Sequence, residues 1–501
     1  MDSQITGKSY KILIINTIAF AVCFAAWMLN GVLVTFLVDA GLYSWSNLQM
    51  GILIATPILT GAVMRLPVGL LSDIYGGRIV IFLLMLIAAI PMFVLSYADS
   101  YVLFLLASLG FGLTGASFAA GIAYTSVWFP KSRVGMALGV FGVGNAGAAL
   151  TTIFAPSLLE FFTATDIEGW RMLPKLYAGI LIGMAIIFWF TTITKLPDQK
   201  VKKRFKDQLA PLAHLRVWRF GLYYSFFFGG FVALSQWLVP YYVNVYTMSI
   251  GMAGFLTSLF SLPSGIIRAL GGWMSDRWGA RAIMYGTLIP GFILCIFLFP
   301  AAMVIQTPGE GITAPQDDII SQVTPKKIVL ESGIELNLEE KNPEKILDFT
   351  AERTLIFPTS TAWQEPVVEE GEEVHQGQLL AKGTTRIFFQ ANQWLFTFFV
   401  FLLGLVMGIG MAAVFKHIPT YFPSDVGVVG GLVGVLGGLG GFFFPIIFGL
   451  LLEWTGLWTT TWMFLALVAA VSLIWMHLVV KKMMNEQTQS GMMQKLEDFE
   501  S

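Results

Sequence analysis

Twelve long apolar runs constrain what this chain can fold into more than any other feature of its sequence. A helix needs roughly 20 apolar residues to cross a lipid bilayer, and these runs are long enough. Hydrophobic residues make up 56% of the chain and charged residues only 12%, which is more apolar surface than a water-soluble domain can bury. The sequence therefore predicts an all-α polytopic membrane protein. The predicted spans are 11–37, 47–72, 78–97, 102–129, 135–160, 174–194, 217–246, 251–274, 282–304, 391–418, 426–452 and 459–480.

The charged residues between these runs are divided unequally between the two sides of the membrane. If the N-terminus is inside, the short inner loops are basic and the short outer loops are mainly acidic. The inner loops hold Arg78, Lys131, Arg133, Lys200, Lys202, Lys203, Arg204, Lys206, Arg277, Arg281, Lys481 and Lys482. The outer loops hold Asp39, Asp99, Glu160, Asp166, Glu168 and Glu453, with Arg171 and Lys175 as their cations. This positive-inside pattern predicts a protein of the inner (plasma) membrane with both termini in the cytoplasm.

One signature occurs twice, and each copy is preceded by an arginine inside an apolar run. GLLSDIYGGR at 69–78 and GWMSDRWGAR at 272–281 both read G-x-x-x-D-x-x-G-x-R. Arg65 lies four residues before the first copy, and Arg268 lies four residues before the second. The shared spacing predicts two pseudo-symmetric bundles of six helices. Repeated halves are typical of secondary transporters, which bind substrate between the halves near the membrane midplane.

A second repeated pair shows where additional residues lie. The run GNAG at 144–147 corresponds to GGLG at 437–440, at a larger separation than that of the two signatures. The surplus falls at 306–390, where the apolar pattern stops and short strand-like runs appear. The predicted organisation is an N-terminal six-helix bundle (1–194), a cytoplasmic linker (195–216), helices 7–9 (217–305), a β-rich periplasmic insert (306–390), helices 10–12 (391–482) and a cytoplasmic tail (483–501).

The two signature loops resemble those of the major facilitator superfamily, and three further features resemble one family within it. These are the arginines ahead of the signatures, GVFGVGNAG at 139–147 and GVLGGLGGF at 434–442. Together they resemble the nitrate/nitrite porter family, the NarK-like branch, over all twelve spans but not the insert. The resemblance implies a transporter of nitrate, nitrite or both that works by alternating access. It implies no cofactor and no nucleic-acid partner.

The resemblance also implies a binding site. Arg65 and Arg268 correspond to the family's two anion-binding arginines. Phe118 corresponds to an aromatic residue that packs on the anion. Asn145 corresponds to the asparagine of the first glycine-rich signature, and we expect its buried amide to contact the substrate or to be satisfied by other partners.

Two further spans carry the comparison less directly. In LYYSFFFGGFVALS, Tyr224 and Phe228 correspond to a tyrosine and a phenylalanine that line the family's site. This alignment needs one extra residue, so Tyr223 is the alternative to Tyr224. In the tenth span, Met411 and Ala413 stand where the family usually has asparagine and serine, which leaves the preference between nitrate and nitrite open.

The two arginines also indicate an anion on physical grounds. Arg65 lies about 6 Å along its helix from Gly69, toward the bilayer interior, where a charge costs at least a few kcal/mol unless it faces a partner or a cavity. The alternative is that it snorkels to the surface. Apart from Glu160 at the outer end of 135–160, no acidic residue lies inside a predicted span, so a bound anion is the natural counter-charge. A guanidinium stays charged and can pair bidentately with a planar oxyanion.

The same charges suggest a mechanism. Two facing arginines repel each other when no anion lies between them, so an empty carrier should reorient poorly and exchange should be favoured. Lys416 and His417 could carry a proton or act in gating, which leaves proton symport open. The alternative for both residues is a solvated cytoplasmic helix end.

The signature loops offer candidate gate residues on the cytoplasmic side. We expect Asp73 to pair with Arg78, and Asp276 to pair with Arg281, in one conformation of the carrier. The alternative is that the two arginines only signal membrane orientation.

The insert carries its own resemblance. PVVEEGEEVHQGQLLAKG at 366–383 resembles half of a lipoyl/biotinyl-type hammerhead, through the spacing of Gly371, Val374, Gly377 and Leu379. The expected hairpin has no modifiable lysine, so we expect no covalent cofactor. We expect a small β-rich periplasmic domain, with His375 on its surface, that binds a partner or caps the periplasmic mouth.

Nitrate/nitrite exchange is the leading functional hypothesis, and three others stay open. They are a proton-coupled nitrate symporter, a porter for another small anion, and an anion sensor built on a carrier fold. An enzyme is not expected, because the sequence offers no buried nucleophile–base pair, no Cys/His metal spacing and no Walker loop.

Overall fold

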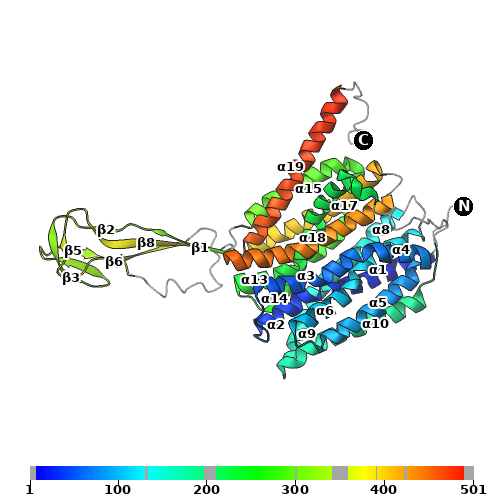
Figure 1. The fold of residues 1–501 in the computed structure, drawn as a ribbon, viewed down its shortest axis with the longest axis horizontal. Coiled ribbons are helices and arrows are strands. Elements are labelled where there is room, and N and C mark those ends of the chain that lie inside the picture. Colours follow the sequence, from blue (N-terminus) through cyan, green and yellow to red (C-terminus); the bar gives the residue numbers. More distant parts are fainter. Residues whose placement is uncertain are drawn as a thin grey trace. The chain divides into compact units, whose positions relative to one another are not determined.

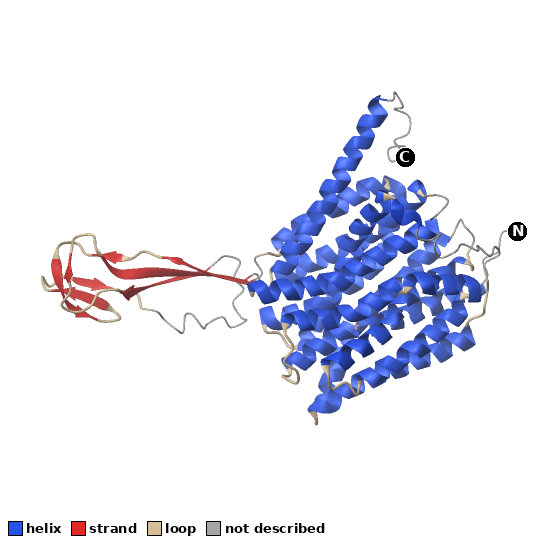
Figure 2. Cartoon of the chain, in the orientation of Figure 1, coloured by secondary structure: helices blue, strands red, loops and turns tan. Residues whose placement is uncertain are grey.

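The structure is a computed structural model that describes residues 7–129, 134–196, 210–299, 302–340, 359–390, 392–422 and 426–489. Lys131 and Arg133, most of the predicted linker and most of the predicted tail lie outside the described residues. The chain forms two compact units, one of residues 1–299 with 397–501 and one of residues 300–396. Figure 2 shows that the first unit is helical and that the strands belong to the second.

The helical unit contains twelve helices that are long and apolar enough to cross a membrane, within the described ranges. This confirms the prediction of an all-α polytopic membrane protein with twelve spans. The ninth span ends at Phe297 rather than at residue 304, because strand β1 begins at Ala302 and pairs with β8. Hydrophobicity alone could not show where the helix ends and the strand begins, because β1 continues the apolar run.

The first six spans, shown in blue to cyan-green in Figure 1, are made of helices interrupted by short irregular turns. They comprise α1 (Gly7–Trp27), α2 (Leu29–Asp39), α3 (Asn47–Val63), α4 (Arg65–Tyr75), α5 (Gly77–Leu95), α6 (Tyr101–Phe111), α7 (Ser117–Ser126), α8 (Val134–Gly142), α9 (Gly147–Thr163) and α10 (Met172–Thr191). The 3₁₀ turns among them are η1 (Gly112–Ala116), η2 (Val143–Ala146) and η3 (Ile167–Arg171).

The last six spans follow a short turn, η4 (Ala210–Ala213). They comprise α12 (Leu215–Tyr224), the π-helical turn η5 (Ser225–Gly229), α13 (Gly230–Tyr246), α14 (Ile250–Trp278), α15 (Ala280–Phe297), α17 (Gln393–Tyr421), α18 (Val426–Thr455) and α19 (Thr460–Gln489).

The two halves meet closely along α3 and α18. A Cβ atom on Gly51 would lie 2.5 Å from the carbonyl oxygen of Pro445, and one on Gly449 would lie 2.4 Å from the carbonyl oxygen of Asn47. The Leu48 N–H also donates to Glu453 Oε2 at 3.2 Å. Small residues let membrane helices approach at backbone distance, so the glycines hold the two halves together at this end of the bundle.

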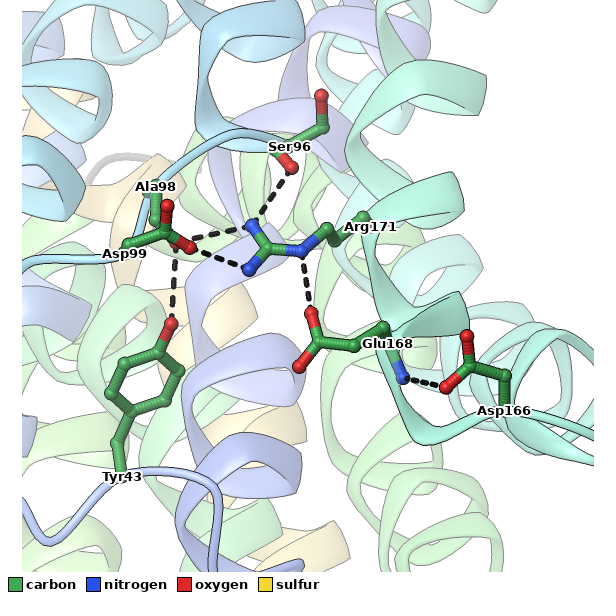
Figure 3. A network of polar contacts seen from close by, with 7 residues as sticks. All are labelled: Tyr43, Ser96, Ala98, Asp99, Asp166, Glu168 and Arg171. Carbon is green, nitrogen blue, oxygen red and sulfur yellow. Dashed lines mark hydrogen bonds and ion pairs between the residues drawn. The ribbon is translucent and has the colours of Figure 1, made fainter.

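Arg171, one of the two cations predicted on the outer side, lies in the polar network of Figure 3. Its guanidinium forms ion pairs of 2.6 Å with both Asp99 and Glu168. It also donates to the carbonyl oxygens of Ser96 and Ala98, at 3.1 and 3.3 Å. Two carboxylates therefore compensate this arginine locally, and its donors tie the loop after α5 to the start of α10.

The second unit consists of two antiparallel sheets. One has the order β1-β8-β2, with β6 also paired to β8, and the other has the order β5-β4-β3-β7. The strands are β1 (Ala302–Pro308), β2 (Ile312–Thr313), β3 (Asp318–Val323), β4 (Lys327–Leu330), β5 (Glu335–Asn337), β6 (Thr359–Pro366), β7 (Glu373–Val374) and β8 (Leu379–Gln390). This confirms the prediction of a small β insert between helices 9 and 10.

One apolar core joins the two sheets of the insert. Ile320 and Ile328 come from one sheet and Leu380 from the other, and all three are buried in the same cluster. Gly371 and Gly377 have positive φ angles of 87° and 85°, which a residue with a Cβ rarely adopts. These backbone angles give a physical reason for the glycine spacing. The His375 side chain is 81% exposed and lies 3.7 Å from Asp317 Oδ1.

Candidate functional site

Several spans lose regular α-helical geometry next to a predicted site residue. The 3₁₀ turn η1 ends just before Phe118, and the 3₁₀ turn η2 contains Asn145. The π-helical turn η5 contains Phe228 and directly follows Tyr224. Arg65 is the first residue of α4, just after the break at Met64. Irregular turns of this kind often occur at functional sites, because they redirect side chains and free backbone groups.

Arg65 is buried, with 3% of its surface exposed. Its Nη1 donates to the carbonyl oxygen of Gly434 at 2.8 Å, while Nε and Nη2 have no partner among the described residues. The guanidinium carbon lies 5.1 Å from the ring centre of Phe118 and 4.9 Å from that of Phe228. The side chain therefore reaches into the bundle and does not snorkel to its surface.

Arg268 approaches the same ring of Phe118, with its Cζ atom 5.6 Å from the ring centre. Its Nη2 lies 3.4 Å from the hydroxyl of Tyr224, and its Nη1 is buried without a partner in the part of the chain that the structure describes. Phe118 comes from the N-terminal half and Tyr224 from the C-terminal half. The two arginines thus share one aromatic neighbour across the interface between the halves.

Tyr224 and Phe228 form the other wall of this region. Their rings are stacked, with centres 5.1 Å apart and an angle of 3° between the planes. A Cβ atom on Gly437 would lie 2.2 Å from a ring carbon of Tyr224, so this ring occupies the space that a side chain on α18 would need. The glycine-rich run of the eleventh span therefore makes room for the tyrosine beside Arg268.

Asn145 is fully buried, and neither atom of its amide has a partner within the described ranges. It lies beside α14, where a Cβ atom on Gly265 would be 3.0 Å from the backbone nitrogen of Ala146. No described hydrogen bond joins Asn145 to either arginine. An unpaired buried amide costs about 1–3 kcal/mol, which is consistent with a bound partner.

Comparison with known proteins identifies the fold family of this arrangement. A model of the Major Facilitator Superfamily matches residues 15–314. A protein of Thermus thermophilus described as "Probable nitrate/nitrite antiporter NarK1" is 40% identical over 486 residues, covering 96% of this chain and 93% of that protein. The chain belongs to the nitrate/nitrite porter family of this superfamily. This confirms both the predicted family and the predicted fold class.

Two other relatives have names that also refer to nitrate or nitrite transport or extrusion. "Probable nitrate/nitrite transporter NarK2" of Mycobacterium tuberculosis is 33% identical over 306 residues, covering 60% of this chain and 73% of that protein. "Nitrite extrusion protein" of Bacillus subtilis is 26% identical, with coverages of 86% and 85%.

Solved structures add support for the fold alone. A bacterial homologue of the human lysosomal transporter Spinster matches with a TM-score of 0.61 at 14% identity, covering 95% of this chain and 97% of that one. The nucleoside transporter NupG matches with a TM-score of 0.58 at 11% identity, covering 95% and 100%.

In this structure, the residues of the two signature loops make other contacts than the predicted gate pairs. Asp73 is exposed, and no ion pair joins it to Arg78 within the described residues. Arg78 instead donates to the Trp189 carbonyl oxygen at 2.5 Å and lies 4.1 Å from the Trp189 ring centre. Gly76, with φ at 87°, turns the chain so that Arg78 lies in the first turn of α5, which packs along α10.

The second loop makes a different pair as well. Asp276 pairs with Lys416 at 2.5 Å, and Arg281 lines a cavity together with His417. The His417 ring stacks on Phe220 with centres 5.7 Å apart. The Lys416 side chain is about half exposed, and its ammonium group is held by this ion pair.

The structure also separates the two tyrosines of the seventh span. Tyr224 contacts Arg268, whereas Tyr223 lines the cavity that contains Arg281. The π-helical turn η5, which accommodates an extra residue in a helix, begins directly after both tyrosines.

Sequence reasoning missed three neighbours of the arginines. Trp27 lies 5.7 Å from Arg65 Cζ, and Phe415 lies 5.8 Å from Arg268 Cζ and 4.9 Å from the Tyr224 ring. The third is the carbonyl oxygen of Gly434. Phe415 had a usable signal, because it directly precedes the candidate residue Lys416. A backbone carbonyl carries no residue-type signal at all.

Proposed function

We propose that this chain is a secondary active transporter that exchanges nitrate and nitrite across the inner (plasma) membrane by alternating access. The anion is held between Arg65 and Arg268. One observation carries the proposal: two guanidinium groups from opposite halves approach the same aromatic ring, and neither has a carboxylate partner among the described residues. The names of the relatives support nitrate and nitrite as the substrates.

The open donors match a small planar oxyanion. Arg65 offers Nε and Nη2, and Arg268 offers Nη1. Nitrate has three equivalent oxygens in one plane, and nitrite has two, so each can accept from both arginines. Charge-assisted hydrogen bonds to guanidinium are about twice as strong as neutral ones. The flat face of Phe118 can pack against the face of such an anion, while a tetrahedral anion would project an oxygen toward the ring.

The charge arrangement favours exchange over one-way transport. The two Cζ atoms lie 5.1 and 5.6 Å from one ring centre, so the charges are at most about 11 Å apart and repel by at least about 1.5 kcal/mol at an effective dielectric constant near 20. A monoanion between the arginines adds two attractions that outweigh this repulsion and let the halves close around it. The empty carrier lacks that compensation, so its reorientation should be slow.

Nitrate uptake into proteoliposomes tests the proposal. Vesicles are preloaded with nitrite, with no anion, or with no anion under an inward proton gradient. Uptake that requires internal nitrite supports exchange. Uptake driven by protons alone would show symport and direct attention to Lys416 and His417. No uptake by folded protein would favour a porter for another small anion or a sensor.

Another anion is the second candidate, because of two buried positions in α17. Met411 and Ala413 are fully buried where the family usually has asparagine and serine. Competition of other small anions against labelled nitrate, at equal concentration, measures this preference.

The orientation and the loops complete the proposal. Both termini are cytoplasmic, and Asp73, Arg78, Asp276 and Arg281 act in a cytoplasmic gate in another conformation of the carrier. The local compensation of Arg171 supports the orientation, because it accounts for a cation on the outer side. The insert is periplasmic and either binds a partner or caps the mouth. Protease accessibility of residues 306–390 in right-side-out vesicles tests its side.

A further inference from the structure

A cationic cavity lies among α12, α15, α17 and α19, and neither Arg65 nor Arg268 lines it. Its volume is ≈ 30 Å³, which admits about two water molecules or one small polar group. Arg219, Arg281 and His417 line it, together with the hydroxyl-bearing Tyr223. Of these residues, only Arg281, in the cytoplasmic gate, and His417, in the symport alternative, are named in the proposed function; Arg219 and Tyr223 have no role in it.

Tyr223 provides the most specific signal in this cavity. Only 2% of its surface is exposed, and its hydroxyl has no hydrogen-bond partner among the described residues. A buried polar group without a partner costs about 1–3 kcal/mol. A ligand oxygen in the cavity would satisfy this hydroxyl.

The charges around the cavity select an anionic ligand. Arg219 and Arg281 are both partly buried, and the exposed Arg216 has its Cζ atom 5.0 Å from the ring centre of Tyr421, which lines the cavity. No aspartate or glutamate lines the cavity within the described ranges. Asp276 on α14 is already paired with Lys416.

The remaining wall of the cavity is apolar and belongs to α19. Met476, Val479 and Val480 line it, and Ile474 and Leu478 on the same helix are each 59% exposed on the outside of the bundle. Trp218 of α12 is 48% exposed nearby in sequence, as is common for residues at a membrane interface. A small cationic pocket at the edge of a membrane surface suits a lipid headgroup with its acyl chains alongside.

We propose that this cavity binds the phosphate group of an anionic phospholipid. The Tyr223 hydroxyl and the Arg219 guanidinium donate to phosphate oxygens, Arg281 adds positive charge, and the acyl chains lie along α19. The lipid site and the nitrate site are thus built on adjacent residues of one helix, Tyr223 and Tyr224. The proposal does not depend on the transport activity.

The test measures thermal unfolding of the full-length protein in phosphatidylcholine micelles that are titrated with phosphatidylglycerol. The wild type should show a saturable rise in Tm. Arg219→Gln should raise the half-saturating lipid fraction about tenfold, and Tyr223→Phe should raise it severalfold. Tyr223→Phe keeps the packed ring, so this variant tests the hydroxyl without risking the fold.

Arg277→Gln is the matched control. Arg277 is an exposed arginine of the same signature loop that lies 5.7 Å from the Trp273 ring centre and does not line the cavity. This variant should respond to the lipid like the wild type. An equal loss in the control, or an equal rise of Tm with added phosphatidylcholine, would overturn the proposal. So would an equal, variant-sensitive rise with inorganic phosphate, which would show a site for a free anion.

Discussion

Replacing Arg65 with lysine tests whether the fork of donors holds the anion or only the charge does. The guanidinium uses Nη1 on the Gly434 carbonyl and leaves Nε and Nη2 open. Lysine keeps the charge but offers one compact ammonium group, which cannot bond Gly434 and two anion oxygens in the same geometry. The expected loss is about one charge-assisted hydrogen bond, or roughly 1.5–3 kcal/mol.

This energy corresponds to a nitrate affinity about 10- to 150-fold weaker. Isothermal titration calorimetry of the purified protein in detergent measures it directly and does not depend on reorientation. Arg277→Lys is the control, because that exposed arginine lies on Trp273. If folded Arg65→Lys protein bound nitrate within about threefold of the wild type, the bidentate argument would be wrong. The site would then act as a simple point charge.

Three further changes test other contacts. Gly437→Ala places a methyl group 2.2 Å from the Tyr224 ring, so it should destabilise the protein by about 1–3 kcal/mol and weaken nitrate binding. Gly286→Ala is the control, because a Cβ atom at Gly286 meets open space, and it should do neither. Equal Tm values for the two variants would refute the packing argument. Phe415→Leu removes the ring beside Arg268 and Tyr224 and should weaken nitrate binding about three- to tenfold, measured by the same titration. Arg171→Gln loses two ion pairs whose partners are 79% and 49% exposed, so the free energy of unfolding should fall by only about 1 kcal/mol in low salt and by less in high salt; an unchanged salt dependence would contradict this.

The number and order of the membrane spans could be predicted from the sequence because they depend on local properties. Run length and apolar content decide which segments can cross a bilayer, and the twelve predicted spans match twelve helices apart from a few terminal residues. The end of the ninth span was placed wrongly, because β1 is itself apolar and only its pairing with β8 shows that it is a strand.

The candidate site also has residues that the sequence predicted and residues that it did not. Sequence reasoning selected Arg65, Arg268 and Phe118, and the structure brings them together. It did not find Trp27 or the carbonyl of Gly434, since neither differs from an ordinary membrane-helix residue in type. For the signature arginines it predicted aspartate partners in one conformation of the carrier; in this structure Arg78 contacts Trp189, 111 positions away.

The sequence by itself determined that this chain spans a membrane, that it repeats one design in two halves, and that each half places an arginine deep in a helix. These conclusions follow from the cost of burying charge and from the length of apolar runs, which need no knowledge of neighbours. Only the tertiary structure decided which groups each arginine contacts and which tyrosine stands beside Arg268. Successive residues on a helix point about 100° apart, so a shift of one position moves a hydroxyl from the cavity lined by Arg281 to the side of Arg268.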